Sequence, residues 1–157
     1  PEYHFQMTRI GIALYGIDPR GPKSSRLEPA LKWHARILQV RSAEIGDRVG
    51  YNGTFELTRP SRIATIGVGY ADGYHRKLGG RATIKIGKCV VPVIGRVSMD
   101  SVTADITDLD SADLQNNEAL LIHSDYNLYD MAKDAETIPY EIITRLGTRA
   151  YRNFALI

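Results

Sequence analysis

Short strand-like segments separated by turn residues are the feature that most constrains how this chain folds. Turn chemistry occurs at residues 52–53 (NG), 59–61 (RPS), 79–80 (GG) and 87–88 (GK). Strands are expected at residues 48–51, 62–70, 82–86, 89–94, 102–106 and 119–123. Short strands at this spacing favour a mostly antiparallel β barrel or sandwich over a parallel α/β sheet.

Residues 31–37 alternate strictly between apolar and basic side chains, which predicts another strand. Leu38 and Val40 then continue in the opposite phase, which predicts a β-bulge. Residues 9–17 are interpreted as a short buried strand that runs into a turn, and residues 18–29 as a Pro-, Gly- and Ser-rich linker. Two short helices are expected at residues 128–135 and 140–146, the second ending at Gly147.

Composition limits the class of protein and its compartment. With 157 residues, 43% of them hydrophobic, the chain can bury one sizeable core. Its formal charge of +2 comes from interspersed signs, which gives no indication of a nucleic-acid partner. The single Cys89 excludes an internal disulfide, and no apolar run reaches the roughly 20 residues of a membrane helix. A cytoplasmic location is therefore expected. Because neither an initiator Met nor a targeting segment stands at Pro1, we expect a trimmed piece of a longer protein.

Three kinds of site are disfavoured by residue spacing. Residues 67–73 (GVGYADG) follow a strand as nucleotide-binding loops do, but no helix is expected directly after them. A strand that ends in a tight turn is the preferred interpretation. No serine lies in the nucleophile-elbow pattern of hydrolases. No metal site is predicted, because metal-ligand spacing is missing among Cys89 and the four histidines, His4, His34, His75 and His123.

Four of the nine tyrosines lie at the expected ends of elements: Tyr51, Tyr70, Tyr74 and Tyr140. Tyrosines in loops are often functional. Each one taken alone is more simply an amphipathic edge residue that keeps its hydroxyl in water. Composition leaves both interpretations open.

Five sequence blocks carry a more specific signal. They are residues 9–16 (RIGIALYG), 49–51 (VGY), 67–74 (GVGYADGY), 95–100 (GRVSMD) and 138–141 (IPYE). In their order and spacing these blocks closely resemble the alanine racemases, which depend on pyridoxal phosphate. The resemblance covers nearly the whole chain, so it is far more specific than any single glycine motif.

The resemblance implies an architecture of two parts. Members of the family have an N-terminal (β/α)8 barrel that carries the cofactor lysine, followed by a C-terminal β domain. Residues 1–17 would then be the end of that barrel, 18–30 a linker, and 31–157 the C-terminal domain, a barrel-like antiparallel unit with short helices near its end. The lysine would lie upstream of Pro1, so we expect the chain by itself to be inactive.

Four residues match positions that hold the cofactor, pyridoxal 5′-phosphate, in this family. Arg9 would face the pyridine nitrogen, where a permanently charged guanidinium disfavours protonation of that nitrogen. The backbone N–H groups of Gly11 and Ile12 would hold the phosphate, a task for which glycine allows close approach. The hydroxyl of Tyr140 would meet the same phosphate.

Tyr51 resembles the catalytic base of the family. Racemisation on the pyridoxal phosphate aldimine removes a proton from one face of the substrate and returns one to the other, which requires two bases, the lysine and this tyrosine. A free phenol has a pKa of about 10, so cationic neighbours on the barrel are expected to tune it. The resemblance also implies that the Met99 N–H meets the substrate carboxylate and that Tyr70 narrows the site.

Arg76, Arg96 and Ile138 match positions that line the entrance corridor in this family. His75 departs from the proline or apolar residue that is common at its position, which puts the shape of the corridor in question. In the family the β domain of one subunit completes the active site of the other. A head-to-tail homodimer is therefore implied, in which Tyr51 serves the partner's cofactor.

The implied function is the interconversion of L-alanine and D-alanine, an isomerase reaction that supplies D-alanine for the peptidoglycan of the cell wall. Three alternatives stay open. They are a serine or broad-specificity amino-acid racemase of the same fold, a non-catalytic basic β-barrel binding module, and a related decarboxylase. The blocks at residues 49–51 and 95–100 disfavour the decarboxylase. Neither a nucleic acid nor a membrane is expected as a partner.

Overall fold

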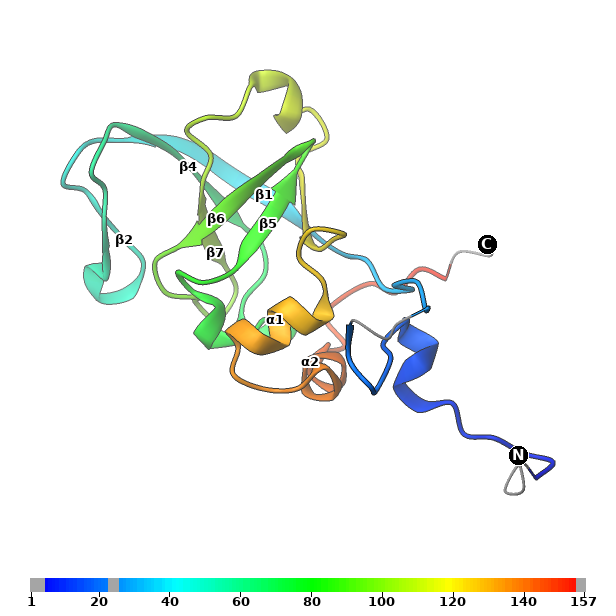
Figure 1. Ribbon diagram of the computed structural model, residues 1–157. Helices are drawn as coiled ribbons and strands as arrows, with labels where there is room; N and C mark the ends of the chain where they lie inside the picture. The colour runs from blue at the N-terminus through cyan, green and yellow to red at the C-terminus, as the bar shows by residue number, and fades with distance from the viewer. Residues whose placement is uncertain (1–4, 23–25, 155–157) are drawn as a thin grey trace.

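Six antiparallel strands close into a barrel, which confirms the predicted mostly β fold (Figure 1). The computed structural model describes residues 5–22 and 26–154. The expected segments 1–17, 18–30 and 31–157 each include residues outside this described part, and so does His4. Around the barrel, the strands follow the order β1 (Trp33–Ala43), β4 (Ser61–Ile66), β7 (Val102–Asp105), β6 (Cys89–Ile94), β5 (Thr83–Ile86) and β8 (Glu118–Ile122).

The long strand β1 closes the barrel because it pairs with two neighbours in succession. Its first half pairs with β8 and its second half with β4, and the register shifts between Ile37 and Gln39. Trp33 and Ile37 are buried, whereas Leu38 and Val40 are 62% and 41% exposed. The predicted bulge is therefore confirmed. After it, the apolar residues Leu38 and Val40 of β1 face outward.

Alternate side chains of the strands fill the barrel. In β5, Ile84 and Ile86 are fully buried, while Thr83 and Lys85 between them are partly exposed. A smaller second cluster packs beneath a hairpin of two short strands, β2 (Arg48–Val49) and β3 (Phe55–Glu56). Its buried members are Ala43, Val49, Leu57, Ile63 and Ile94. This cluster fixes the hairpin against the barrel wall.

Two helices cover one end of the barrel (Figure 1). α1 (Leu128–Asp134) begins after Asn127, whose side-chain oxygen accepts a hydrogen bond from the N–H of Tyr129 at 2.8 Å. α2 (Pro139–Arg145) begins with a proline, which lacks the N–H that would be unpaired there. Both predicted helices are confirmed to within one residue at each end. Their buried faces are formed by Leu128, Met131, Ala132 and Ile142.

The strand expected at residues 9–17 is wrong, because this segment forms the short 3₁₀ helix η1 (Gly11–Tyr15). Gly11 and Gly16 have φ values of +62° and +78°, in the left-handed region that interrupts a strand. A buried strand also needs ladder partners, and none of the strands in the described residues pairs with this segment. Ile12 and Ile17 nevertheless belong to the main core, so the apolar pattern marks burial rather than a strand.

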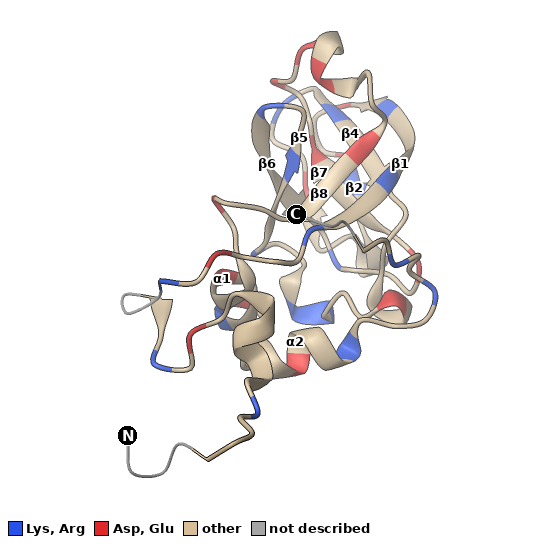
Figure 2. Cartoon of the chain, turned by 90° about the vertical axis from the view of Figure 1, so that its right-hand side faces the viewer, with Lys and Arg blue, Asp and Glu red and all other residues tan. Residues whose placement is uncertain are grey.

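Basic and acidic side chains are interspersed over the barrel and its loops, without a large region of one sign (Figure 2). This distribution fits the small net charge. Within residues 5–22 and 26–154, no helix combines the length and the apolar character that crossing a bilayer requires.

An ion-pair cluster ties the end of α1 to the neighbouring 3₁₀ helix η5 (Arg76–Leu78). The carboxylate of Glu136 accepts from Lys77 Nζ at 2.5 Å and from Arg81 Nη1 at 2.6 Å. These two cations, Lys77 first, lower the pKa of Glu136 to about 2. Since the folded-state pKa is depressed, the cluster stabilises the fold above the ordinary pKa of 4.5 and loses this effect as the pH falls toward 2.

We therefore predict that Glu136→Gln unfolds at a lower urea concentration than the parent chain at pH 7 and that this difference shrinks between pH 4.5 and pH 2. Fluorescence of the single tryptophan, Trp33, reports the unfolding of the barrel. Glu44→Gln removes an exposed carboxylate that has no ion pair within the described segments, so it serves as the control. A difference between parent and Glu136→Gln that stays constant from pH 7 to pH 2.5 would contradict the prediction.

Candidate functional site

Tyr51 lies on the rim of the barrel at the tip of the β2–β3 hairpin. The strand expected at residues 48–51 ends at Val49, and Tyr51 begins the 3₁₀ helix η3 (Tyr51–Gly53). Gly50 has a φ of +79°, and a Cβ at this position would lie 2.6 Å from the backbone nitrogen of Arg96. Position 50 therefore requires glycine for two reasons: its left-handed conformation and the close approach of two backbones. The Tyr51 side chain is 61% exposed, so its hydroxyl is not part of this chain's own core.

Tyr70 and Met99 lie on two loops whose backbones are hydrogen-bonded to each other. The strand expected at residues 62–70 ends at Ile66, and Tyr70 begins the 3₁₀ helix η4 (Tyr70–Asp72). The N–H of Tyr70 donates to Ser98 O at 3.0 Å, and the N–H of Ala71 donates to Met99 O at 3.0 Å. Tyr70 and Met99 expose 45% and 52% of their surfaces. Together with the contact of Gly50, these bonds join three loops on one surface, which we call the rim site (residues 50–51, 69–72 and 95–100).

The predicted corridor residues divide between the rim site and α2. Arg96 belongs to the rim site. Gly79, the residue directly after η5, packs against the same loop: a Cβ on Gly79 would lie 2.6 Å from Gly95 O. Arg76, the first residue of η5, is thereby held beside the rim site with its side chain exposed. Ile138 is the residue before α2 and is 59% exposed.

His75, the departure from the family pattern, has a local structural role. Its Nδ1 accepts a hydrogen bond from the N–H of Lys77 at 3.3 Å and so caps η5. Burial and then the nearby Arg145 lower the pKa of His75, which favours the neutral ring that this acceptor role needs.

The predicted cofactor residues lie on η1, on the segment before it and on α2, outside the three loops of the rim site. Gly11 and Ile12 begin η1, where the first N–H groups of a helix have no partner within it. A Cβ on Gly11 would meet no atom within 4 Å, so the backbone is open to a ligand on that side. Ile12 packs in the same core cluster as Ile142 of α2, the helix that carries the half-exposed Tyr140. Arg9 is exposed in the segment before η1.

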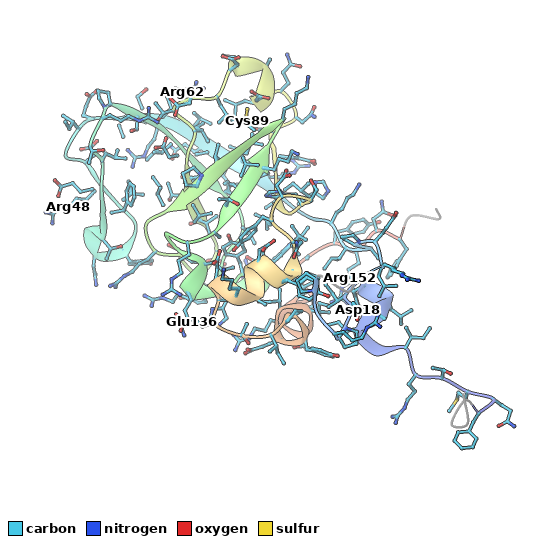
Figure 3. The ribbon with its side chains drawn as sticks, viewed as in Figure 1. Asp18, Arg48, Arg62, Cys89, Glu136 and Arg152 are labelled. Carbon is cyan, nitrogen blue, oxygen red and sulfur yellow. The ribbon has the colours of Figure 1, made fainter. Side chains whose placement is uncertain are left out.

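The chain therefore separates its predicted site residues into two groups. Figure 1 places η1 on the side of the molecule away from the β2 hairpin, with α2 between them. In Figure 3, Arg48 of that hairpin lies at the opposite side from Asp18 and Arg152. One copy of the chain thus brings Tyr51, Tyr70 and Met99 together but does not bring them to Gly11.

Tyr74 fits neither interpretation considered for it from the sequence. It is fully buried, and its ring lies 5.9 Å from that of Trp33. Its hydroxyl has no hydrogen-bond partner in the described part of the chain, and burial raises its pKa. Tyr74 is therefore a core residue, and the expectation of a hydroxyl in water is wrong at this position.

Three charged residues were not singled out from the sequence: Asp72 and Asp100 of the rim site, and Arg149, which contacts both of them. Asp72 Oδ2 accepts the N–H of Gly69 at 2.8 Å, and Arg149 forms ion pairs with both carboxylates. The two aspartates lie inside the blocks GVGYADGY and GRVSMD, and this position could have marked them as candidate site residues. Nothing in the sequence marks Arg149, because it follows the blocks and is one of many basic residues.

A cavity of about 460 Å³ lies elsewhere, at the edge of the barrel formed by β1, β5 and β8. Its lining includes Leu31, His34, Lys85, Leu120 and His123. None of the residues predicted for catalysis, substrate or cofactor lines it. Burial lowers the pKa of His123, whose ring nitrogens have no hydrogen-bond partner in the parts of the chain that are described.

Comparison with known proteins agrees with this geometry. Residues 30–154 match the family described as alanine racemase, C-terminal domain. The chain is 44% identical over 170 residues to the alanine racemase of Brucella ovis, which covers 99% of this chain and 43% of that protein. It is 44% identical over 153 residues to the alanine racemase of Acidiphilium cryptum, with 97% and 42% covered. The chain thus spans about two fifths of the length of these curated relatives.

Solved structures show the same fold. The crystal structure of alanine racemase from Bartonella henselae with covalently bound pyridoxal phosphate superposes with a TM-score of 0.86 at 41% identity, over 92% of this chain and 40% of that one. The biosynthetic alanine racemase from Pseudomonas aeruginosa gives a TM-score of 0.84 at 31% identity, over 93% and 41%.

The fold and the rim site together define a β-barrel domain of the kind that forms the C-terminal part of an amino-acid racemase. The chain belongs to the alanine racemase family.

The contact between Gly69 and Met99 leads to a direct structural test. Gly69 has a φ of −150°, which any residue can adopt, but an added Cβ would lie 2.2 Å from Met99 O and 2.4 Å from Ser98 O. We expect Gly69→Ala to destabilise the chain by about 1–3 kcal/mol, because two backbone segments must move apart. Urea unfolding measures this loss.

Gly147→Ala is the matched control, since a Cβ there would meet nothing closer than 3.7 Å. Its stability should change by no more than about 0.5 kcal/mol. Equal stability of Gly69→Ala and Gly147→Ala would show that the two loops are not packed as described.

Proposed function

We propose that the full-length protein interconverts L-alanine and D-alanine with pyridoxal 5′-phosphate as cofactor and that this chain supplies its C-terminal part. The observation that carries the proposal is the rim site, where the exposed Tyr51 shares one surface with Tyr70 and Met99. Family membership supplies the reaction class. We further propose a cytoplasmic enzyme whose D-alanine is used for peptidoglycan.

The proposal assigns residues 1–17 to the end of a (β/α)8 barrel, 18–30 to a linker and 31–157 to the C-terminal domain. The match of the family to residues 30–154 supports the last assignment. The buried Ile12 and Ile17 support a tight association of the first segment with the domain that follows. The cofactor lysine would lie in the barrel.

The start of η1 and the exposed Tyr140 fit a phosphate group. The N–H groups of Gly11 and Ile12, which have no partner within the short helix they begin, would offer donors, and the missing Cβ of Gly11 leaves room for an anion. When bound, pyridoxal phosphate withdraws electrons from the α-carbon of the substrate and so acidifies its proton. Arg9 would limit this withdrawal, because a permanent cation beside the pyridine nitrogen disfavours protonation there.

Met99 would use its backbone N–H to bind the substrate carboxylate. Ser98 O accepts the N–H of Tyr70 at 3.0 Å. Because the peptide between Ser98 and Met99 is planar and trans, the N–H of Met99 points opposite to that carbonyl, away from the backbone of the Tyr70 loop. Met99 as a whole is 52% exposed, and in the proposed mechanism this N–H would donate to the substrate carboxylate.

Tyr51 would act as the base on one face of the substrate, since inversion requires proton removal and return on opposite faces. Its exposure allows the phenol to reach outward to another polypeptide segment. The separation between the β2 hairpin and η1 means that Tyr51 would serve the cofactor of a second copy of the protein (Figure 1). A head-to-tail homodimer with two shared sites satisfies this requirement.

Arg76 and Arg96, held on adjoining loops, and Ile138, before α2, would line the entrance corridor. Two guanidinium groups near an entrance attract an anionic carboxylate. Rates with alanine and serine, measured on the full-length enzyme, test how selective the site is for the smaller side chain.

The decisive experiment is Tyr51→Phe in the full-length enzyme. We expect racemisation to fall by at least about a thousandfold, because one of the two faces loses its base. One enantiomer should still exchange its α-proton with solvent through the remaining base, which NMR in D₂O measures separately for each enantiomer.

Tyr151→Phe is the control, since Tyr151 is 93% exposed and has no assigned role. Racemisation by Tyr51→Phe at the rate of the parent enzyme would refute the role of Tyr51. Loss of α-proton exchange from both enantiomers would refute the assignment of a separate base to each face of the substrate.

A further inference from the structure

We propose that Arg149 is a positioning residue that holds the Tyr70 loop and the Met99 loop in register. This inference rests on the proposed function, because it gives these two loops the task of presenting the substrate-binding N–H and the wall of the site. Arg149 itself would touch neither substrate nor cofactor.

The guanidinium of Arg149 bridges one carboxylate from each loop. Its Nε lies 3.2 Å from Asp72 Oδ1, and its Nη1 lies 2.7 Å from Asp100 Oδ1. Asp72 directly follows the residues that bond to the second loop, and Asp100 directly follows Met99. One side chain thus spans the same pair of loops that the two backbone hydrogen bonds join.

The carboxylate of Asp72 links Arg149 to the backbone of the first loop. Its second oxygen, Oδ2, accepts the N–H of Gly69 at 2.8 Å, and its side chain is only 15% exposed. A carboxylate that is held from both oxygens has little freedom to rotate. Movement of Arg149 is therefore transmitted to Gly69, which is packed directly against Met99 O.

The end of α2 closes the cluster from the other side. The N–H of Gly147 donates to Asp72 O at 3.3 Å, and a Cβ on Gly73 would lie 2.2 Å from Arg145 O. The segment after α2 is thus fixed to the Tyr70 loop before it reaches Arg149. Because α2 also carries Tyr140, this arrangement connects the rim site to the helix proposed to face the chain's own cofactor.

An arginine is specifically suited to this bridge. Its planar guanidinium offers separate nitrogens to the two carboxylates, whereas a lysine ammonium is a single compact point charge. Arg149 and Asp100 are 52% and 59% exposed, so the ion pairs are expected to contribute little to global stability. Their effect should appear in the order of the loops instead.

The test uses Arg149→Gln and Arg149→Lys in the full-length protein, with Arg152→Ala as the control. Arg152 lies three residues further along the same segment and donates to Leu146 O, not to either loop. Hydrogen exchange measured by mass spectrometry follows the amides of residues 69–71, and steady-state kinetics follows alanine racemisation.

We expect Arg149→Gln to raise amide exchange at residues 69–71 by about tenfold and to raise KM for alanine by about fivefold, with a smaller change in kcat. The Met99 N–H would contact the carboxylate equally in the bound substrate and in the transition state. Its displacement therefore raises KM and changes kcat little. Arg149→Lys should give an intermediate result, and Arg152→Ala should leave both measurements as in the parent. A loss of folded enzyme would instead lower the apparent kcat at constant KM.

Unchanged exchange at residues 69–71 in Arg149→Gln would overturn the proposal, and so would raised exchange with an unchanged KM in an active enzyme. If the parent protein does not racemise alanine at all, the proposed function fails. In that case hydrogen exchange alone decides whether Arg149 holds the loops together.

Discussion

Closure of the barrel by β1 is the constraint on which the other features of this molecule depend. A sheet has no unpaired edge only when its first and last strands pair with each other. Here β1 pairs with β8 through its first half and with β4 through its second, and a bulge after Ile37 lets it turn between them. The closed wall fixes where each strand ends, and the ends of the strands determine where the loops of the rim site begin.

The rim site is built from close backbone contacts rather than from side-chain packing. At Gly50 and Gly69, a side chain would overlap Arg96 N and Met99 O. Each contact brings a segment distant in sequence within reach of the next, so the loops of Tyr51, Tyr70 and Met99 share one surface. Because packed backbones deform little, such a surface can hold exposed side chains at defined positions.

The predicted site residues fall into two separate groups, and for this reason the proposed mechanism uses two copies of the protein. In the proposed mechanism, the exposed Tyr51 and the start of η1 would serve different active sites, each completed by residues from two copies of the protein. Asp72, Asp100 and Arg149 add a charged bridge within the first group. The bridge lies where two loops must keep their register if Met99 is to present its N–H.

The sequence by itself determined the six strands of the barrel, the bulge and the two helices, because alternation, turn residues and capping act over a few neighbouring positions. Its motif blocks also indicated Tyr51, Tyr70 and Met99. It did not reveal that residues 9–17 form a 3₁₀ helix or that Tyr74 is buried, since apolar content signals burial without specifying backbone conformation. The ion pairs of Arg149, on which its proposed role rests, were decided only by tertiary structure: its carboxylate partners come from two other loops, and the distance between charges depends on how the whole chain folds.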